Sequence, residues 1–168
     1  MVQTEKPNLN MALRELKNEL NQMDKTEIIK LILEIYKKIP DAKNYLDIFS
    51  TGDIDKQIEK YKSEIEKYIY PKGSSLDMHE AEARKIIRTV RKMNITELNI
   101  ELELHYVSCC LVVVEDFGYF DANYYTSMEK MFDNAISGID KIGVKEKYLD
   151  RIKTLSHKAT EYGIELEY

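Results

Sequence analysis

The sequence predicts an all-α protein, an irregular bundle of seven or eight helices with a buried central helix. Apolar residues recur at spacings of three and four along most of the 168 residues, as they do on the buried face of a helix. Only three prolines are present and none follows Pro71, which permits long helices. The length fits a single domain over residues 1–168.

The first fifty residues predict three helices, each with one apolar stripe. Asp24 and Glu27 have the spacing of a capping box, which begins the second helix. Pro40 ends that helix and opens the third. The stripes are Leu9, Leu13, Leu16 and Leu20; Ile28, Leu31, Ile32, Ile35 and Ile39; and Ala42, Tyr45, Leu46 and Phe49.

Two helices are expected between residues 53 and 93. Asp53 is the N-cap of the first, which ends before Pro71. Residues 72–75 form the clearest loop and are a candidate hinge, too short for a domain linker. A basic helix follows over 76–93, and Asn94 with Glu97 predicts a second capping box.

The pattern over residues 96–117 is ambiguous. Alternating apolar residues from Leu98 to Leu104 are typical of a strand, whereas spacings of three and four continue to Val113. About 20 residues is too long for an ordinary strand, so a helix is favoured. From Leu104 onward this helix is apolar on nearly all sides, which predicts the buried centre of the bundle.

Two more helices complete the chain. Gly118 ends the central helix, Asp121 caps the next one, and Gly143 ends it. The last apolar stripe is Tyr148, Ile152, Leu155, Ala159 and Tyr162.

Composition favours a cytoplasmic protein without membrane contact. The longest apolar run, 106–114, is roughly half of what a membrane span needs, and no targeting segment is recognisable. The two cysteines, Cys109 and Cys110, are adjacent and cannot form a relaxed disulfide, which indicates a reducing compartment.

Catalytic and metal-binding patterns are weak. Glu101, His105 and Cys109 are residue types that zinc accepts, but eight residues of helix span ~12 Å, so one ion reaches at most two of them. A buried thiol is a poor partner for a thiolate–imidazole pair. Gly138 and Gly143 have P-loop spacing but lack the Lys and Ser/Thr that must follow. We expect no catalytic residues, no metal site and no cofactor.

Five basic residues form a candidate nucleic-acid surface on one helix: Arg84, Lys85, Arg88, Arg91 and Lys92. The alternative is that they pair with the protein's own acidic segment, 96–143, which holds two basic and nine acidic residues. The net charge of −5 favours this alternative.

Four aromatic residues around the 118–121 turn form a candidate partner-binding surface: Tyr119, Phe120, Tyr124 and Tyr125. These rings fit equally well as core beneath the turn. The first interpretation predicts a non-catalytic protein-interaction, adaptor or self-associating module. Nucleic-acid-linked regulation through the 84–92 face is the alternative.

Several stretches together resemble an uncharacterised bacterial family of helical proteins, a domain of unknown function. They are spread over most of the chain: 10–17, 24–32, 40–46, 104–107, 116–118 and 124–132. The resemblance implies a helical bacterial protein. It supplies no catalytic residues.

Overall fold

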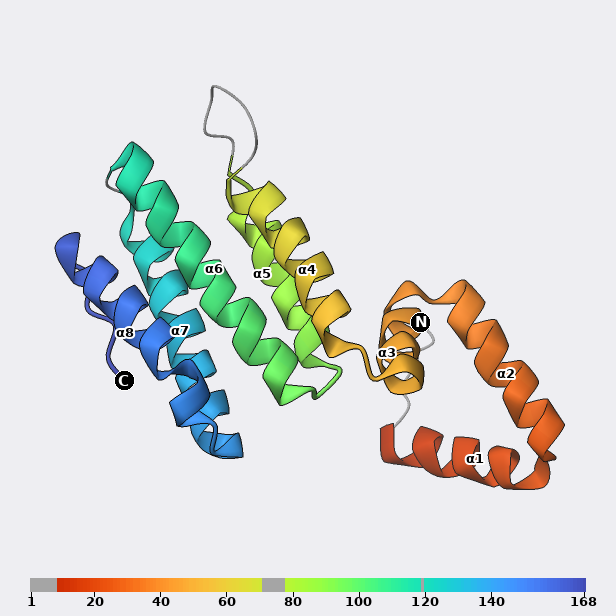
Figure 1. Cartoon of the computed structure of the whole chain (residues 1–168). Helices are drawn as coiled ribbons and strands as arrows, with labels where there is room; N and C mark the ends of the chain where they lie inside the picture. The colour runs from red at the N-terminus through yellow and green to blue at the C-terminus, as the bar shows by residue number, and fades with distance from the viewer. Residues whose placement is uncertain (1–8, 71–77, 119) are drawn as a thin grey trace, which may run out of the picture. The chain divides into compact units, whose positions relative to one another are not determined.

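The computed structural model describes residues 9–70, 78–118 and 120–168, and eight α-helices without a strand account for its regular structure (Figure 1). The helices are α1 (Leu9–Gln22), α2 (Lys25–Lys38), α3 (Pro40–Thr51), α4 (Ile54–Ile69), α5 (Glu80–Arg91), α6 (Thr96–Phe117), α7 (Ala122–Ile142) and α8 (Lys145–Glu161). The all-α prediction is confirmed, and so is a helix over the ambiguous 96–117 stretch.

The chain divides into two compact units, Met1–Ser50 and Thr51–Tyr168. The single domain expected from the length stays a prediction, and the candidate hinge at 72–75 lies outside the described residues. The first unit contains α1, α2 and most of α3, and the second contains α4 to α8.

The first unit buries little of its apolar surface. Among its described side chains only Ile48 is buried, and α2 has no buried residue at all. The Tyr36 hydroxyl donates a hydrogen bond to Asp47 Oδ1 at 2.8 Å and so joins α2 to α3. The Asp24 capping box is confirmed, because Asp24 Oδ1 accepts from the Glu27 amide and the Glu27 side chain accepts from the Asp24 amide.

Helix α6 is the centre of the second unit. It contacts α4, α5, α7 and α8, with α4 and α5 paired on one flank and α7 and α8 on the other (Figure 1). Twelve of its residues are buried, from Leu98 to Val114, because its sequence is apolar on nearly all sides. The prediction of a buried central helix is confirmed.

Most helix ends follow the sequence signals, although the basic helix expected over 76–93 spans only Glu80–Arg91. Asp53 and Asp121 cap α4 and α7 through their side chains, and Gly143 ends α7 in the left-handed conformation, at φ 68°. The capping box expected at Asn94 and Glu97 is wrong. Asn94 instead adopts φ 57°, which an asparagine tolerates, so it forms the turn and Ile95 becomes the N-cap without a side-chain hydrogen bond.

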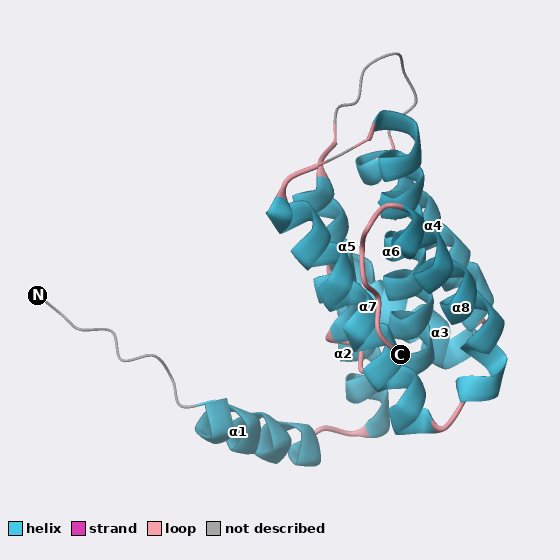
Figure 2. Cartoon of the chain, turned by 90° about the vertical axis from the view of Figure 1, so that its left-hand side faces the viewer, coloured by secondary structure: helices cyan, strands magenta, loops and turns pink. Residues whose placement is uncertain are grey.

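After α8 the chain turns at Gly163 and runs back along the bundle (Figure 2). Ile164 and Leu166 are buried, and the Ser156 hydroxyl donates to the Leu166 carbonyl at 2.8 Å, which fastens the segment to α8. None of the described helices combines the length and apolarity needed to cross a bilayer.

Candidate functional site

The aromatic turn is partly core. Tyr124 is buried, its hydroxyl donates to the Cys110 carbonyl at 2.9 Å, and its ring stacks on Phe120 at 4.6 Å between centroids. The Phe120 amide donates to the Tyr125 hydroxyl at 3.0 Å, while Tyr119 lies outside the described residues. Tyr124 is therefore part of the core of the second unit, and partner binding by this cluster stays a prediction.

The basic helix α5 directs two of its arginines toward the protein itself. Arg84 donates to Glu80 at 2.7 Å and to the Tyr106 hydroxyl at 3.1 Å. Arg91 pairs at 2.6 Å with Glu103, which is only 3% exposed on the acidic helix α6. Burial raises the pKa of Glu103 and the Arg91 charge opposes this effect.

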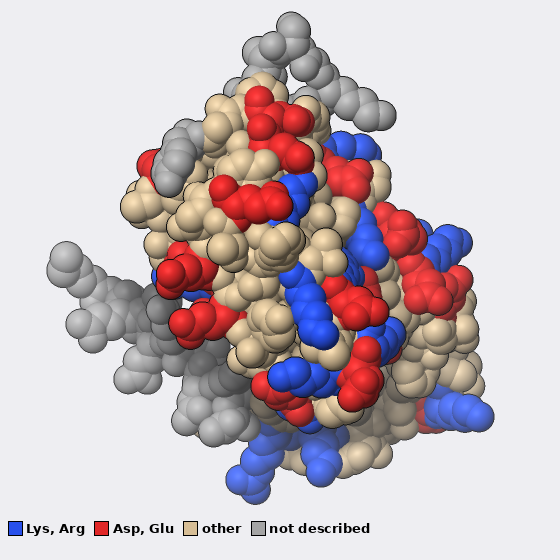
Figure 3. Space-filling model, turned by 60° about the vertical axis from the view of Figure 1, so that its left-hand side comes forward, with Lys and Arg blue, Asp and Glu red and all other residues tan. Residues whose placement is uncertain are grey.

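The remaining basic residues of the candidate nucleic-acid surface point to solvent. Lys85 lies 3.3 Å from Glu82, and Arg88 and Lys92 are exposed. On the face drawn in Figure 3, acidic and basic side chains are mixed over the centre and right, and the upper and left parts carry mostly acidic ones. Arg84 and Arg91 are thus occupied by internal pairs, which leaves a small basic surface for a nucleic acid.

The first unit carries a large exposed apolar surface. Nine large apolar side chains of this unit are at least two-fifths exposed, and Phe49 is 80% exposed. We call these the first-unit apolar surface: Met11, Leu13, Leu16, Ile29, Ile32, Leu33, Ile39, Tyr45 and Phe49. The sequence analysis placed six of them in its apolar stripes, but treated the stripes as core.

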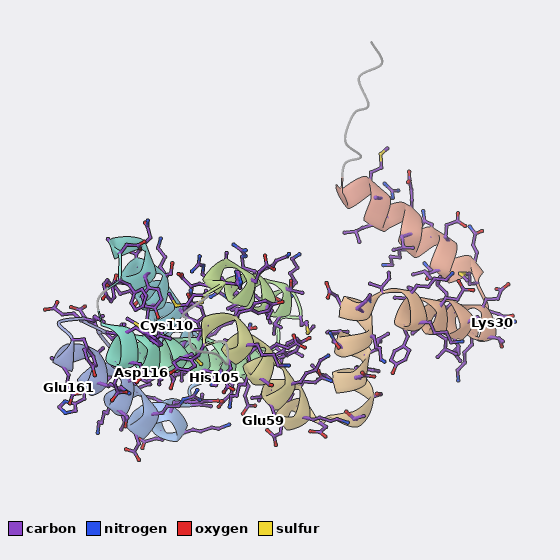
Figure 4. All side chains as sticks on the ribbon, turned by 90° about the horizontal axis from the view of Figure 1, so that it is seen from above. Lys30, Glu59, His105, Cys110, Asp116 and Glu161 are labelled. Atoms are coloured by element: carbon purple, nitrogen blue, oxygen red, sulfur yellow. The ribbon has the colours of Figure 1, made fainter. Side chains whose placement is uncertain are left out.

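The row of Glu101, His105 and Cys109 does not act as one group. Glu101 forms ion pairs with Arg151 at 2.8 Å and with Lys62 at 3.2 Å. His105 and Cys109 instead meet Glu66 of α4. His105 Nε2 lies 3.2 Å from Glu66 Oε1 and 3.5 Å from Cys109 Sγ, and Figure 4 shows His105 on α6 beside α4.

This cluster is not arranged for nucleophilic catalysis. A catalytic triad needs the nucleophile on one imidazole nitrogen and the carboxylate on the other, whereas here both face Nε2. Burial, followed by the Glu66 charge, raises the pKa of Cys109 to about 12, and burial also lowers the pKa of His105. Both groups are therefore neutral at pH 7, in line with the expectation from sequence for a buried thiol.

The sequence analysis missed Glu66. The apolar stripe of α4, which includes the buried Tyr61 and Ile65, could have indicated its position. Lys62 and Glu66 each follow one of these residues, so they lie together at the edge of the buried face. Which residues of α6 they meet depends on the register of the two helices.

The second unit thus defines a helical bundle organised around one buried helix. The chain belongs to a family of unknown function, DUF6155, which matches residues 11–165. The resemblance to a helical family without an assigned activity is confirmed. Comparison with curated proteins and with solved structures found no match.

Proposed function

We propose that this protein is a self-associating interaction module, and that the first-unit apolar surface docks on the same surface of a second copy. The observation that carries the proposal is the exposure of nine large apolar side chains on α1–α3 while Ile48 alone is buried among the described side chains there. Monomeric proteins rarely expose large contiguous apolar patches, and where such patches occur they typically mark interfaces.

The first unit needs a further surface to be stable. Helices of 12 to 14 residues are marginal in water by themselves, and tertiary packing of their apolar faces stabilises them. Nine such side chains, between 42% and 80% exposed, offer an apolar area comparable to the ~800 Å² that each partner buries in a standard interface.

Charge favours a second copy as the occupant. Residues 1–50 contain eight basic and eight acidic residues, whereas 51–168 contain 17 and 22, which gives the whole net charge of −5 to the second unit. Two copies therefore approach through their neutral units without like-charge repulsion. A neutral apolar surface offers nothing specific to a nucleic acid.

The test is the mass of the full chain in solution, by light scattering after size exclusion and by sedimentation over a wide concentration range. We expect a dimer. Ile32→Gln and Leu33→Gln each remove a buried apolar side chain from the interface, so each weakens dimerisation by roughly tenfold or more. The matched control is Ile142→Gln, because Ile142 of α7 is 40% exposed and Ile32 is 42% exposed.

A chain that is monomeric at every concentration overturns the proposal. So does a dimer that Ile142→Gln dissociates while Ile32→Gln and Leu33→Gln do not. Circular dichroism of each variant distinguishes dissociation from unfolding of the helices.

We also propose that the protein is located in a reducing compartment, the cytoplasm, as inferred from the sequence. It is supported by Cys109 and Cys110, which are both buried and free.

Nucleic-acid binding through α5 stays a prediction, and a salt-sensitive DNA shift lost in Arg88→Ala would test it.

A further inference from the structure

Two helices of the second unit bring three different metal-ligating side chains to one point. Glu66 belongs to α4, and His105 and Cys109 lie on successive turns of α6. Their ligand atoms all lie within 4.8 Å of one another. We propose that Glu66, His105 and Cys109 bind one divalent transition-metal ion, and that Zn²⁺ is the ion that their chemistry fits.

The distances match tetrahedral zinc coordination. Zinc binds sulfur at about 2.3 Å and nitrogen and oxygen at about 2.0–2.2 Å, which puts sulfur and nitrogen ligands ~3.6 Å apart and nitrogen and oxygen ligands ~3.4 Å apart. The observed separations are 3.5 Å from Cys109 Sγ to His105 Nε2 and 3.2 Å from His105 Nε2 to Glu66 Oε1.

The imidazole of His105 is oriented as a metal ligand. Burial lowers the pKa of His105, and a hydrogen bond with the Lys62 backbone opposes this lowering, as an N–H donated to a carbonyl does. Because Nε2 faces Glu66 and Cys109, Nδ1 is the nitrogen left for this bond. The neutral ring then presents the lone pair of Nε2 to a carboxylate, and a cation between the two removes their repulsion.

The neighbouring cations are already compensated. Lys62 and Arg151 both pair with Glu101, and Lys62 also lies 3.3 Å from Glu59. The negative charge of Glu66 is thus available to an ion. The Glu66 side chain is 57% exposed, so solvent reaches this side of the cluster and a water molecule completes a four-ligand shell.

The ligand types select the class of ion. A thiolate and an imidazole suit zinc and its neighbours, whereas Mg²⁺ and Ca²⁺ prefer oxygen ligands alone. Coordination replaces the Cys109 thiol proton, which passes to solvent, so the bound ligand is the thiolate. This gives the test a specific optical signature.

The experiment uses the full chain without a histidine tag, stripped with a chelator and titrated with Co²⁺, then with Zn²⁺. We expect one Co²⁺ per chain, with visible bands of a tetrahedral site and a near-ultraviolet thiolate-to-cobalt band. Zn²⁺ should displace Co²⁺ and abolish both. Cys109→Ser removes the charge-transfer band, whereas Cys110→Ser, the matched control, retains it.

Glu66→Gln keeps the experiment decisive if the cysteine variants fail to fold, because Glu66 is exposed. We expect it to weaken Co²⁺ binding by about tenfold or more. Asp55→Asn, which changes an exposed carboxylate on the same helix, leaves binding unchanged. A wild-type chain without a thiolate-to-cobalt band, or a band that Cys109→Ser leaves intact, overturns the proposal.

Discussion

Gly138 of α7 faces Ile100 of α6 so closely that a β-carbon at position 138 would lie 2.9 Å from Ile100 Cγ1. Ile100 is fully buried. The absence of a side chain at position 138 therefore lets the two helices approach each other at the centre of the second unit.

We expect Gly138→Val to lower the free energy of unfolding by about 1–3 kcal/mol, because the added carbons overpack the α6–α7 contact. Urea denaturation followed by circular dichroism measures the change. Ser137→Val is the matched control, since Ser137 is exposed on the same helix. Equal losses for the two variants would show that β-branching, and not the Ile100 contact, is responsible.

The ion pairs of Glu101 make stability depend on pH. Burial raises the pKa of Glu101, but Arg151 and Lys62 together outweigh it, so the pKa lies below the ordinary 4.5. A carboxyl group with a depressed folded-state pKa contributes its full stability above its unfolded-state pKa and loses it as the pH falls from there through the folded-state pKa.

We therefore expect Glu101→Gln to lower the free energy of unfolding by about 1–3 kcal/mol at pH 7, because Arg151 and Lys62, both partly buried, lose the carboxylate that they share. The cost should shrink steadily as the pH is lowered below 4.5. Urea unfolding at a series of pH values tests this. Glu146→Gln, on the exposed side of α8, serves as control, and a cost that does not vary with pH would contradict the interpretation.

Tyr124 distinguishes the two interpretations of the aromatic turn. Tyr124→Phe removes a buried hydroxyl that donates to the Cys110 carbonyl, so the free energy of unfolding should fall by about 0.5–1.5 kcal/mol without a change of oligomeric state. Thermal unfolding and light scattering measure the two effects. Tyr168→Phe, half exposed, should change neither. A Tyr124→Phe variant with unchanged stability but altered association would place the ring in an interface.

The Asp24 capping box stabilises the start of α2. Asp24→Ala leaves the Glu27 amide without its acceptor. It should destabilise the start of the helix by about 1 kcal/mol, which corresponds to a roughly fivefold faster exchange of that amide with deuterium. Asp24→Asn retains a side-chain oxygen and should exchange nearly as the wild type does. Exchange that stays unchanged in Asp24→Ala would mean that the cap does not limit opening of the helix.

Local signals in the sequence predicted the helices well. The apolar character of α6 from Leu104 to Val114 predicted its central position, because a helix that is apolar all round must be covered on all sides. Asp24, Asp53 and Asp121 marked helix starts through interactions with residues three positions away. Asn94 failed as a cap because the same residue type also suits the left-handed turn that it adopts.

The cluster around His105 required information that periodicity does not contain. Glu66 lies 39 residues before His105, and only the packing register of α4 on α6 brings them within 3.2 Å. The row of Glu101, His105 and Cys109 correctly identified two of the three residues. Glu101 is not part of the cluster because it pairs with Arg151 of α8. The sequence pattern did not show that this part of α8 packs against α6.

The position of α6 determines how the second unit loses its structure. Each flanking helix pair packs on α6, so neither pair keeps an apolar neighbour once α6 melts. Residues 51–168 should consequently unfold in one cooperative transition and behave as a protease-resistant fragment. The first unit, with Ile48 as its buried anchor among the described side chains, should melt separately and at a temperature that rises with protein concentration if a second copy covers it.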